Sequence, residues 1–258
     1  LLYRALGHSV PKFFHLPLIL GQDKKKLSKR HGETSVLEFK KQGYLPEALL
    51  TYLAQLSWNP GDSKQIFTMD QLIQKIDFSK LSKNSPEFDF DKLSFLNGRA
   101  IQSCSGKALY DILKNGFEFY AHPDNGNEKV PQFIDLIKPR MKTLDSIKQK
   151  YNCYFATPRV YNQEDTKQVL PNPAIHSALS AFVEKLKALN PFNADTCERL
   201  LRAHADASGL KAADLIHPAR LALTTETVSP GIFDLFEFFG RAEVIHRMTG
   251  FLKEAQKI

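Results

Sequence analysis

Long apolar runs are missing from this sequence of 258 residues. A helix that crosses a membrane needs about 18 consecutive residues that are almost all apolar. The stretch from Phe233 to Phe239 is much shorter, and Asp234 and Glu237 interrupt it. The sequence therefore predicts no membrane span.

Cysteine is scarce, and its three positions, Cys104, Cys153 and Cys197, are far apart. Their odd number, together with the lack of a C-x-x-C pair or a paired histidine spacing, indicates neither a disulfide framework nor a zinc site. The eight histidines also show no spacing typical of a catalytic triad or a metal site. We expect buried thiols in a reducing cytoplasm, and no metal site.

The first seven residues, Leu1 to Gly7, lack an initiator methionine, a basic lead and a long apolar stretch. They resemble neither a secretory signal nor a natural start, so the sequence predicts a fragment of a longer protein. At roughly 150 residues per domain, the length indicates one to three domains. An apolar content of 43% is enough for real cores.

Charge is unevenly balanced, because 35 Lys and Arg residues exceed 28 Asp and Glu residues and give a net charge of +7. The corresponding pI is near 9.2. A basic surface favours a polyanionic partner such as nucleic acid, although many basic proteins bind none.

Helical periodicity dominates after Gly61, and no stretch alternates as strands do, so the predicted fold class is mainly α. The predicted helices carry apolar stripes, and all but the one that starts at about Phe90 begin near a proline or a capping residue. The starting residues are Pro46, Thr68 (with Gln71 as its capping-box partner), Phe90, Ser105, Pro131, Asn172, Asn193 and the pair Ser229-Pro230. Pro139 interrupts the helix that begins at Pro131, so two short helices are expected there.

Two stretches are predicted to be irregular. Residues 122–128 are rich in turn formers, and residues 157–173 are polar, hold three prolines and lack periodicity. The second stretch is predicted to be an interdomain linker or a long loop. By contrast, Trp58 ends a well-patterned helix, and Phe233, Phe236 and Phe239 recur at helical spacing. Both are expected in the core, the alternative being a platform on which RNA bases stack.

The densest run of positive charge extends from Lys24 to Arg30 and is followed by His31 and Gly32. One interpretation is a solvated basic loop, and a second is a nuclear-localisation or RNA-backbone patch, for which short basic runs are a weak signal. A third is a loop that handles phosphate, because an ordered Lys-Leu-Ser-Lys string stands between a strand-like apolar run, Phe14 to Leu20, and a glycine.

The string Lys26-Leu27-Ser28-Lys29-Arg30 resembles the second signature of class I aminoacyl-tRNA synthetases, written K-M-S-K-S. The Leu and Arg variant is common in glutamyl-tRNA synthetases. Its surroundings strengthen the resemblance to the bacterial-type enzyme, which covers essentially the whole chain. The matching segments are 2–7, 10–21, 29–32, 43–49, 93–98, 140–144 and 228–231.

This resemblance implies a domain order. Residues 1–32 are expected to end a class I catalytic domain, 33–104 to form a helical connecting domain that contacts the tRNA stem, and 105–165 and 166–258 to form a two-part helical anticodon-binding domain. The glutaminyl enzyme fits less well, because its anticodon-binding part is built from β-barrels.

Two features depart from the family pattern. The first signature, of the His-Ile-Gly-His type, is absent, and the glutamate pocket belongs to the same missing part. In addition, Thr224-Thr225-Glu226 stands where relatives commonly carry a Thr-Gly pair before the Val-Ser-Pro segment. That difference concerns the local turn.

The activity implied by the resemblance is attachment of glutamate to tRNA(Glu) with ATP, accompanied by Mg²⁺, as substrate and no permanently bound cofactor. Lys29 is the expected principal ATP contact and Lys26 the second, because ammonium groups can stabilise charge that builds on phosphate. Ser28 can add a donor, and Arg30 can serve phosphate or tRNA. With Leu27, these residues form the expected ATP loop.

For the anticodon, the expected contacts are Lys138, Arg140 and Lys142, which cluster near the predicted helix break. Arg140 is expected to donate to a base edge, since a guanidinium can form paired hydrogen bonds. The alternative for each is a solvated face that contacts nothing. We expect a cytoplasmic monomer; the alternative function is a helical RNA-binding module without catalytic ancestry.

Overall fold

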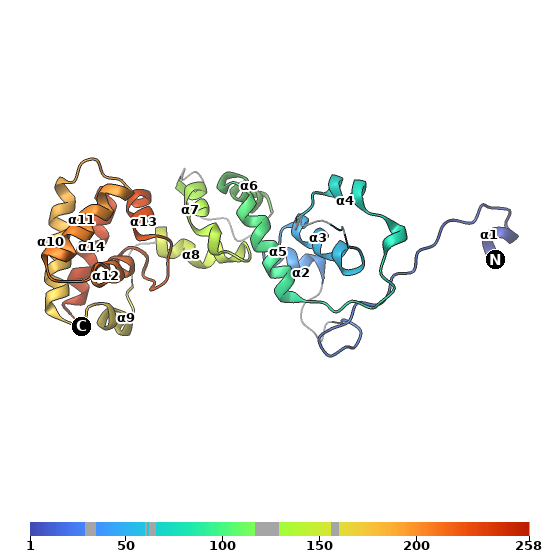
Figure 1. Ribbon diagram of the computed structural model, residues 1–258, viewed down its shortest axis with the longest axis horizontal. Helices are drawn as coiled ribbons and strands as arrows, with labels where there is room; N and C mark the ends of the chain where they lie inside the picture. Colours follow the sequence, from blue (N-terminus) through green and yellow to red (C-terminus); the bar gives the residue numbers. More distant parts are fainter. Residues whose placement is uncertain (29–34, 60, 62–65, 117–128, 156–159, 258) are drawn as a thin grey trace. The chain divides into compact units, whose positions relative to one another are not determined.

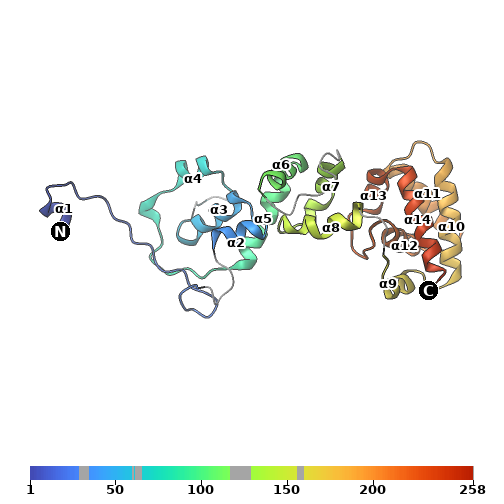
Figure 2. The same ribbon diagram turned by 180° about the vertical axis from the view of Figure 1, so that it is seen from behind.

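The architecture is mainly helical in the part of the chain that the computed structural model describes, namely residues 1–28, 35–59, 61, 66–116, 129–155 and 160–257 (Figures 1 and 2). Extended pairing in these residues is limited to two isolated bridges, Leu20 with Lys26 and Leu20 with Glu87. The predicted mainly α fold class is confirmed. No helix in the described ranges is both long and apolar enough to cross a membrane.

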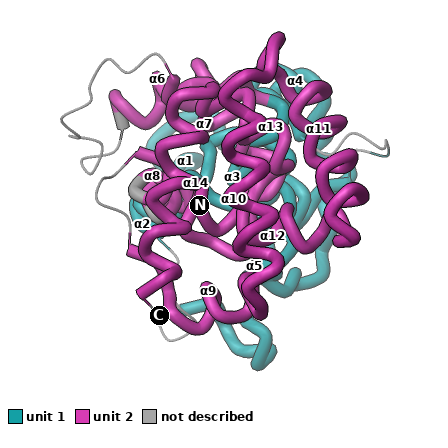
Figure 3. The backbone as a smooth tube through the Cα atoms, turned by 90° about the vertical axis from the view of Figure 1, so that its left-hand side faces the viewer, with its two compact units in different colours: residues 1–103, 142–144 teal, residues 104–141, 145–258 magenta. Residues whose placement is uncertain are grey.

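The chain divides into two compact units, coloured separately in Figure 3. Unit 1 comprises residues 1–103 and 142–144, and unit 2 comprises 104–141 and 145–258. The helices of unit 1 are α1 (Leu2–Ala5), α2 (Val36–Lys41), α3 (Pro46–Ser57), α4 (Met69–Lys75), the 3-10 turn η2 (Phe78–Lys80) and α5 (Phe90–Ser103).

Unit 2 begins with α6 (Gly106–Gly116), α7 (Lys129–Ile137), the 3-10 turn η4 (Lys138–Arg140) and α8 (Asp145–Phe155). It continues with α9 (Gln163–Val169), α10 (Pro173–Ala188), α11 (Ala194–Ala207), α12 (Ala212–Thr224), α13 (Ile232–Phe239) and α14 (Arg241–Ala255). The helices α10 to α14 pack on one another as a bundle.

Unit 1 is built around α3 and α5, whose apolar faces meet. The shared cluster includes Tyr52 from α3 and Leu93 and Leu96 from α5, all nearly inaccessible to water. A second cluster joins Trp58, Phe67 and Leu72, which confirms that Trp58 is a core residue. Apolar burial of this kind is the main force that holds such a small helical unit together.

The predicted helix starts that depend on a capping side chain are confirmed. Thr68 and Gln71 form the reciprocal capping box, and Asn172 accepts hydrogen bonds from the first turn of α10. Asn193 caps α11 in the same way. Pro139 separates α7 from α8, as expected, through the 3-10 turn η4. A side chain that satisfies the first N–H groups replaces the missing helical partners, which is why these starts can be identified from sequence.

Several expectations are wrong. The run Phe14 to Leu20 forms no strand, because Leu20 alone finds a bridge partner and Phe14, Leu16 and Leu18 are exposed. Residues 157–173 are not simply a loop, since Asn162 caps the helix α9 within them. Of the three thiols only Cys197 is buried. The predicted loop at 122–128 lies outside the described residues.

The phenylalanine stripe of α13 is largely buried, as predicted, with Phe236 and Phe239 inaccessible and Phe233 partly covered. Four residues of the apolar stripes that the helical periodicity predicts are exposed. These are Leu53 on α3, Met69 and Ile73 on α4, and Ile112 on α6.

Candidate functional site

A tight turn forms the base of the lysine-rich loop in unit 1. The N–H of Gly21 donates to the carbonyl of Lys25 at 2.8 Å, and the N–H of Lys24 donates to the carbonyl of Gly21 at 2.9 Å. Lys24 has φ 59°, a left-handed conformation that non-glycine residues rarely adopt. The Asp23 carboxylate accepts from the Lys25 N–H at 3.0 Å. This turn reverses the chain and leaves the lysines at 24, 25 and 26 exposed.

The two sides of the turn are anchored to the core of unit 1. Leu27 is partly buried against the α3 and α5 cluster, and its N–H donates to the carbonyl of Ile19 at 2.9 Å. Leu20 accepts from the N–H of Phe88 and donates to the carbonyl of Pro86. The loop therefore begins from a fixed base, while Lys26 and Ser28 face solvent.

Of the five predicted ATP-loop residues, the structure describes Lys26, Leu27 and Ser28. Lys29, the expected principal contact, and Arg30 lie outside the described residues. Leu27 anchors the loop through its apolar side chain, so its position in the signature has a packing reason.

Lys138, one of the predicted RNA contacts, makes internal contacts in unit 2. Its ammonium group lies 2.6 Å from the Asp135 carboxylate and donates to the carbonyl of Cys104 at 2.8 Å. Asp135 also accepts from the N–H of Gly106 at 2.9 Å, at the start of α6. Lys138 thus helps to join α6 to α7, and its charge is compensated within the protein.

Arg140 lies in the same 3-10 turn as Lys138, and it is exposed. One terminal nitrogen of its guanidinium donates to the carbonyl of Ser229, in the segment between α12 and α13. A guanidinium has five N–H groups, so most of its donors remain available for another acceptor. Lys142 is exposed and belongs to unit 1.

The structure adds two residues that the sequence analysis missed, Tyr154 on α8 and Arg220 on α12. The Tyr154 side chain is 1% exposed, and neither its hydroxyl nor the Nε of Arg220 has a hydrogen-bond partner among the described residues. Burial, and then the nearby Arg140 cation, lower the pKa of the Arg220 guanidinium. Burial likewise raises the pKa of the Tyr154 hydroxyl, and the charges of Glu226, Arg140 and Arg247 also act on it.

The charge effects indicate that Arg140, Arg220 and Tyr154 are neighbours, and the Nε of Arg220 and the hydroxyl of Tyr154 are the two donors without an acceptor among the described residues. Two like charges in a partly desolvated place repel each other, so the arrangement is costly unless an acceptor-rich group joins it. Phosphate oxygens and the carbonyl and ring-nitrogen acceptors of RNA bases meet this requirement. We call these three residues the donor cluster. In the sequence, Arg220 could have been noticed as a single cation within the apolar run from Leu215 to Leu223.

The segment beside the donor cluster is held by further ionic contacts. Lys150 pairs with both carboxylate oxygens of Glu226, at 3.0 and 2.8 Å. Arg247 donates to the carbonyls of Leu223 and Tyr154. These bonds fix the ends of α8 and α12, so the cluster rests on an ordered support.

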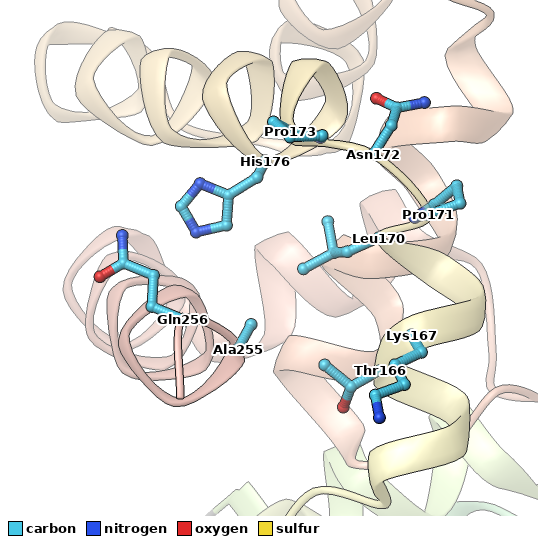
Figure 4. Close-up of a pocket in the computed structure, with 9 residues that line it drawn as sticks. All are labelled: Thr166, Lys167, Leu170, Pro171, Asn172, Pro173, His176, Ala255 and Gln256. Atoms are coloured by element: carbon cyan, nitrogen blue, oxygen red, sulfur yellow. The ribbon is translucent and has the colours of Figure 1, made fainter. Parts of the chain in front are cut away.

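Two hollows in unit 2 lie away from the donor cluster and are lined by none of its residues. One of them has a volume of about 370 Å³. It lies between the end of α9, the start of α10 and the end of α14, and its lining includes Leu170 and His176 (Figure 4). None of the predicted site residues lines it. Within the described ranges, no group of His, Cys, Asp and Glu side chains is arranged to hold a metal ion.

Comparison with known families places this geometry in context. The family model described as an anticodon binding domain matches residues 108–252, and the model described as the catalytic domain of class I tRNA synthetases (E and Q) matches residues 1–95. The chain is similar to glutamate--tRNA ligase 2 of Caldicellulosiruptor saccharolyticus, with 34% identity over 96% of this chain and 52% of that protein. It is 36% identical to glutamate--tRNA ligase 1 of Campylobacter hominis, over 100% of this chain and 54% of that protein.

Comparison with solved structures points to the same family as the sequence comparison. A crystal structure of a glutamate tRNA ligase from Elizabethkingia meningosepticum matches 98% of this chain and 53% of that one, with 29% identity and a TM-score of 0.80. The chain spans about half the length of the curated relatives it matches. The resemblance to bacterial-type glutamyl-tRNA synthetases is thereby confirmed. Since the anticodon-binding match alone covers more than half of the sequence, the chain belongs to the anticodon binding domain family of these synthetases.

Proposed function

We propose that this chain provides the ATP loop and the RNA-reading part of an enzyme that attaches glutamate to tRNA(Glu). The observation that carries the proposal is the presence, in one chain, of a catalytic-domain match at residues 1–95 and an anticodon-binding match at residues 108–252. The relatives that match over both regions are named glutamate--tRNA ligase. A helical RNA-binding module without catalytic ancestry would not require the first match.

The reaction has two steps. The glutamate carboxylate attacks the α-phosphate of ATP, which gives glutamyl-AMP and releases pyrophosphate. A hydroxyl of the terminal ribose of the tRNA then takes the acyl group, and AMP leaves. Mg²⁺ would accompany ATP as part of the substrate. The first step builds negative charge on the phosphates, and ammonium groups held near them lower its barrier.

Within this scheme, Lys29 is the principal phosphate contact and Lys26 the second, while Ser28 can donate to a phosphate oxygen and Arg30 can serve phosphate or tRNA. The exposed position of Lys26 and the anchored position of Leu27 support this assignment. A loop with a fixed base and charged residues beyond it can approach bound nucleotide without rearranging the core.

The four parts keep the roles that the resemblance implies. Residues 1–32 contribute the loop and 33–104 contact the tRNA stem, while 105–165 and 166–258 surround the anticodon. For recognition we propose the donor cluster together with Lys142, whose exposed charge suits a phosphate. For Lys138 we propose a mainly structural role and no direct RNA contact, because Asp135 already compensates its charge. We place the protein in the cytoplasm as a monomer.

The proposed role of the loop is tested in the complete enzyme with Lys29→Ala. The expected result is a loss of roughly 10² to 10³ in the rate of glutamate activation, larger than the change in the Michaelis constant for ATP. Pyrophosphate exchange that depends on glutamate and tRNA measures it, and Lys25→Ala, at an exposed lysine outside the signature, is the matched control. If turnover stays intact and only the Michaelis constant rises, Lys29 does not act where charge develops.

A further inference from the structure

Asn97 occupies an unusual place for a polar side chain, in the middle of α5 and 0% exposed. Asparagine is a poor residue for a helix interior, because its amide competes with the backbone for hydrogen bonds. A buried amide in such a position costs stability unless its donors and acceptor are satisfied. The contacts of Asn97 show how this is achieved.

Its amide makes three hydrogen bonds to two separate backbone segments. The side-chain oxygen accepts from the N–H of Leu45 at 2.8 Å, just before α3. The side-chain nitrogen donates to the carbonyl of Gly43 at 3.3 Å and to the carbonyl of Lys142 at 2.7 Å. Both N–H groups of the amide are therefore used, and the shorter bond goes to Lys142.

A second bond holds the other end of the same short segment. The N–H of Leu144 donates to the carbonyl of Gly43 at 3.0 Å, and the Leu144 side chain is fully buried. Residues 142–144 are thus fixed to unit 1 at both ends, and they are counted within that unit although they are distant in sequence. The Lys142 side chain, however, remains exposed.

We infer that Asn97 is a positioning residue for Lys142, holding its backbone so that its ammonium group is presented to an RNA phosphate. This inference rests on the proposed RNA-binding function and names a residue through which it operates. A lysine on a loose segment must lose both backbone and side-chain freedom when it binds. A lysine whose backbone is already fixed loses only the side-chain part, so its contact is stronger.

The test measures how tRNA binding depends on salt. Each phosphate neutralised by a cation contributes about 0.7 to 0.9 to the slope of log affinity against log salt concentration. The full chain and its variants are titrated with an unmodified tRNA(Glu) transcript at several KCl concentrations. Lys142→Ala should lower the slope by this amount, and Asn97→Asp should lower it by nearly as much.

Asn97→Asp keeps the shape of the side chain and the acceptor for Leu45, but it removes both donors. The double variant should fall no further than Lys142→Ala, because both changes remove one contact. Asn97→Ser is the second variant if the aspartate does not fold. The matched control is Thr51→Val, since Thr51 is also fully buried in unit 1 and bonds to the backbone of Phe67 instead. That control should lower thermal stability and leave the salt slope unchanged.

The outcomes separate the two proposals. If Lys142→Ala leaves the slope unchanged, Lys142 contacts no phosphate, which contradicts its proposed RNA role and the inference together. If Lys142→Ala lowers the slope but neither Asn97 variant does, the RNA role stands and the positioning role is wrong. The positioning role would also be wrong if the double variant lost as much salt slope as the two single variants together. Failure of both Asn97 variants to fold while Thr51→Val folds would overturn it too, because Asn97 would then support the unit as a whole.

Discussion

The guanidinium of Arg247 donates to the backbone carbonyl of Tyr154, so α14 holds the C-terminal end of α8. Arg247 is 3% exposed and also donates to the carbonyl of Leu223 at 2.6 Å, near the end of α12. Its cation lies 3.8 Å from the centre of the Phe239 ring. A positive charge at two helix C-termini is favourable, because unpaired carbonyls give each end a partial negative charge.

Replacing Arg247 with methionine should destabilise unit 2 by about 3 kcal/mol, since it leaves two buried carbonyls without donors and keeps the volume nearly constant. Urea unfolding followed by circular dichroism measures the change. The matched control is Arg202→Met, at an exposed arginine that pairs with Glu198 on its own helix. That control should cost less than about 1 kcal/mol. Equal losses in the two variants would contradict the structural role given to Arg247.

Gly106 should tolerate no side chain. A Cβ atom at this position would lie 2.0 Å from the carbonyl oxygen of Pro131, and backbone cannot move aside cheaply. Gly106→Ala should therefore lower the free energy of unfolding by more than about 2 kcal/mol. Gly250→Ala is the control, because Gly250 lies inside α14 and its Cβ would meet nothing within 4 Å.

The control should stabilise the protein by up to about 1 kcal/mol, as expected when alanine replaces glycine in a helix. Thermal melts of both variants provide the comparison. A Gly106→Ala melting temperature equal to that of the unaltered chain would show that α6 and α7 are further apart than described.

Much of the fold could be predicted from sequence because its signals are local. A capping side chain acts on N–H groups two or three residues ahead, so Thr68, Asn172 and Asn193 identify helix starts without tertiary information. The apolar stripe of α5 likewise predicts which side is buried. The short helix α9 was missed because its polar residues and the neighbouring prolines resemble a loop, and its start depends on one cap, Asn162.

What could not be predicted depends on contacts between distant residues. Nothing local indicates that Arg247 is buried, or that Asn97 bonds to a carbonyl 45 positions away. Similarly, the sequence offers Asp135 as an i,i+3 partner for Lys138, but only the fold brings the carbonyl of Cys104 to it. An apolar run such as Phe14 to Leu20 forms a strand only where a neighbour supplies hydrogen bonds along it, and here the described backbone bonds reach only its end, at Ile19 and Leu20.

Thr225 occupies the position at which relatives commonly carry the glycine of a Thr-Gly pair, and the backbone there suits glycine. It is the C-cap of α12 and has φ 56°, the left-handed region in which glycine is comfortable and a β-branched residue is strained. Thr225→Gly should therefore stabilise unit 2 by about 0.5 to 1 kcal/mol. Urea unfolding measures the gain, and Thr227→Gly, two residues later and outside the positive-φ positions, should show none. A loss of stability at Thr225 would mean that its hydroxyl bond to the Thr224 carbonyl outweighs the strain.

Replacing Arg220 should change RNA recognition much more than the stability of unit 2. Because burial and the nearby Arg140 cation both lower the pKa of Arg220, its charge is unfavourable in the free protein. Arg220→Met should therefore cost little stability, or even add some, in contrast to Arg247→Met.

RNA binding by Arg220→Met, unlike its stability, should be clearly weakened for the cognate anticodon. If Arg220 donates to a base in the donor cluster, Arg220→Met should reduce discrimination between cognate and altered anticodons by about 1 to 3 kcal/mol, and Arg140→Ala should do the same. Their combined effect should be less than the sum, because the two guanidinium groups serve one site.

The measurement is titration of matched anticodon stem-loops at two salt concentrations, with the exposed Arg199→Met as control. A residue that contacts only phosphate weakens all stem-loops equally and reduces the salt dependence, whereas a residue that reads a base changes their order. Equal weakening of every stem-loop by Arg140→Ala would make Arg140 a backbone contact. The same result with Arg220→Met would remove base reading from the donor cluster and leave it a phosphate site.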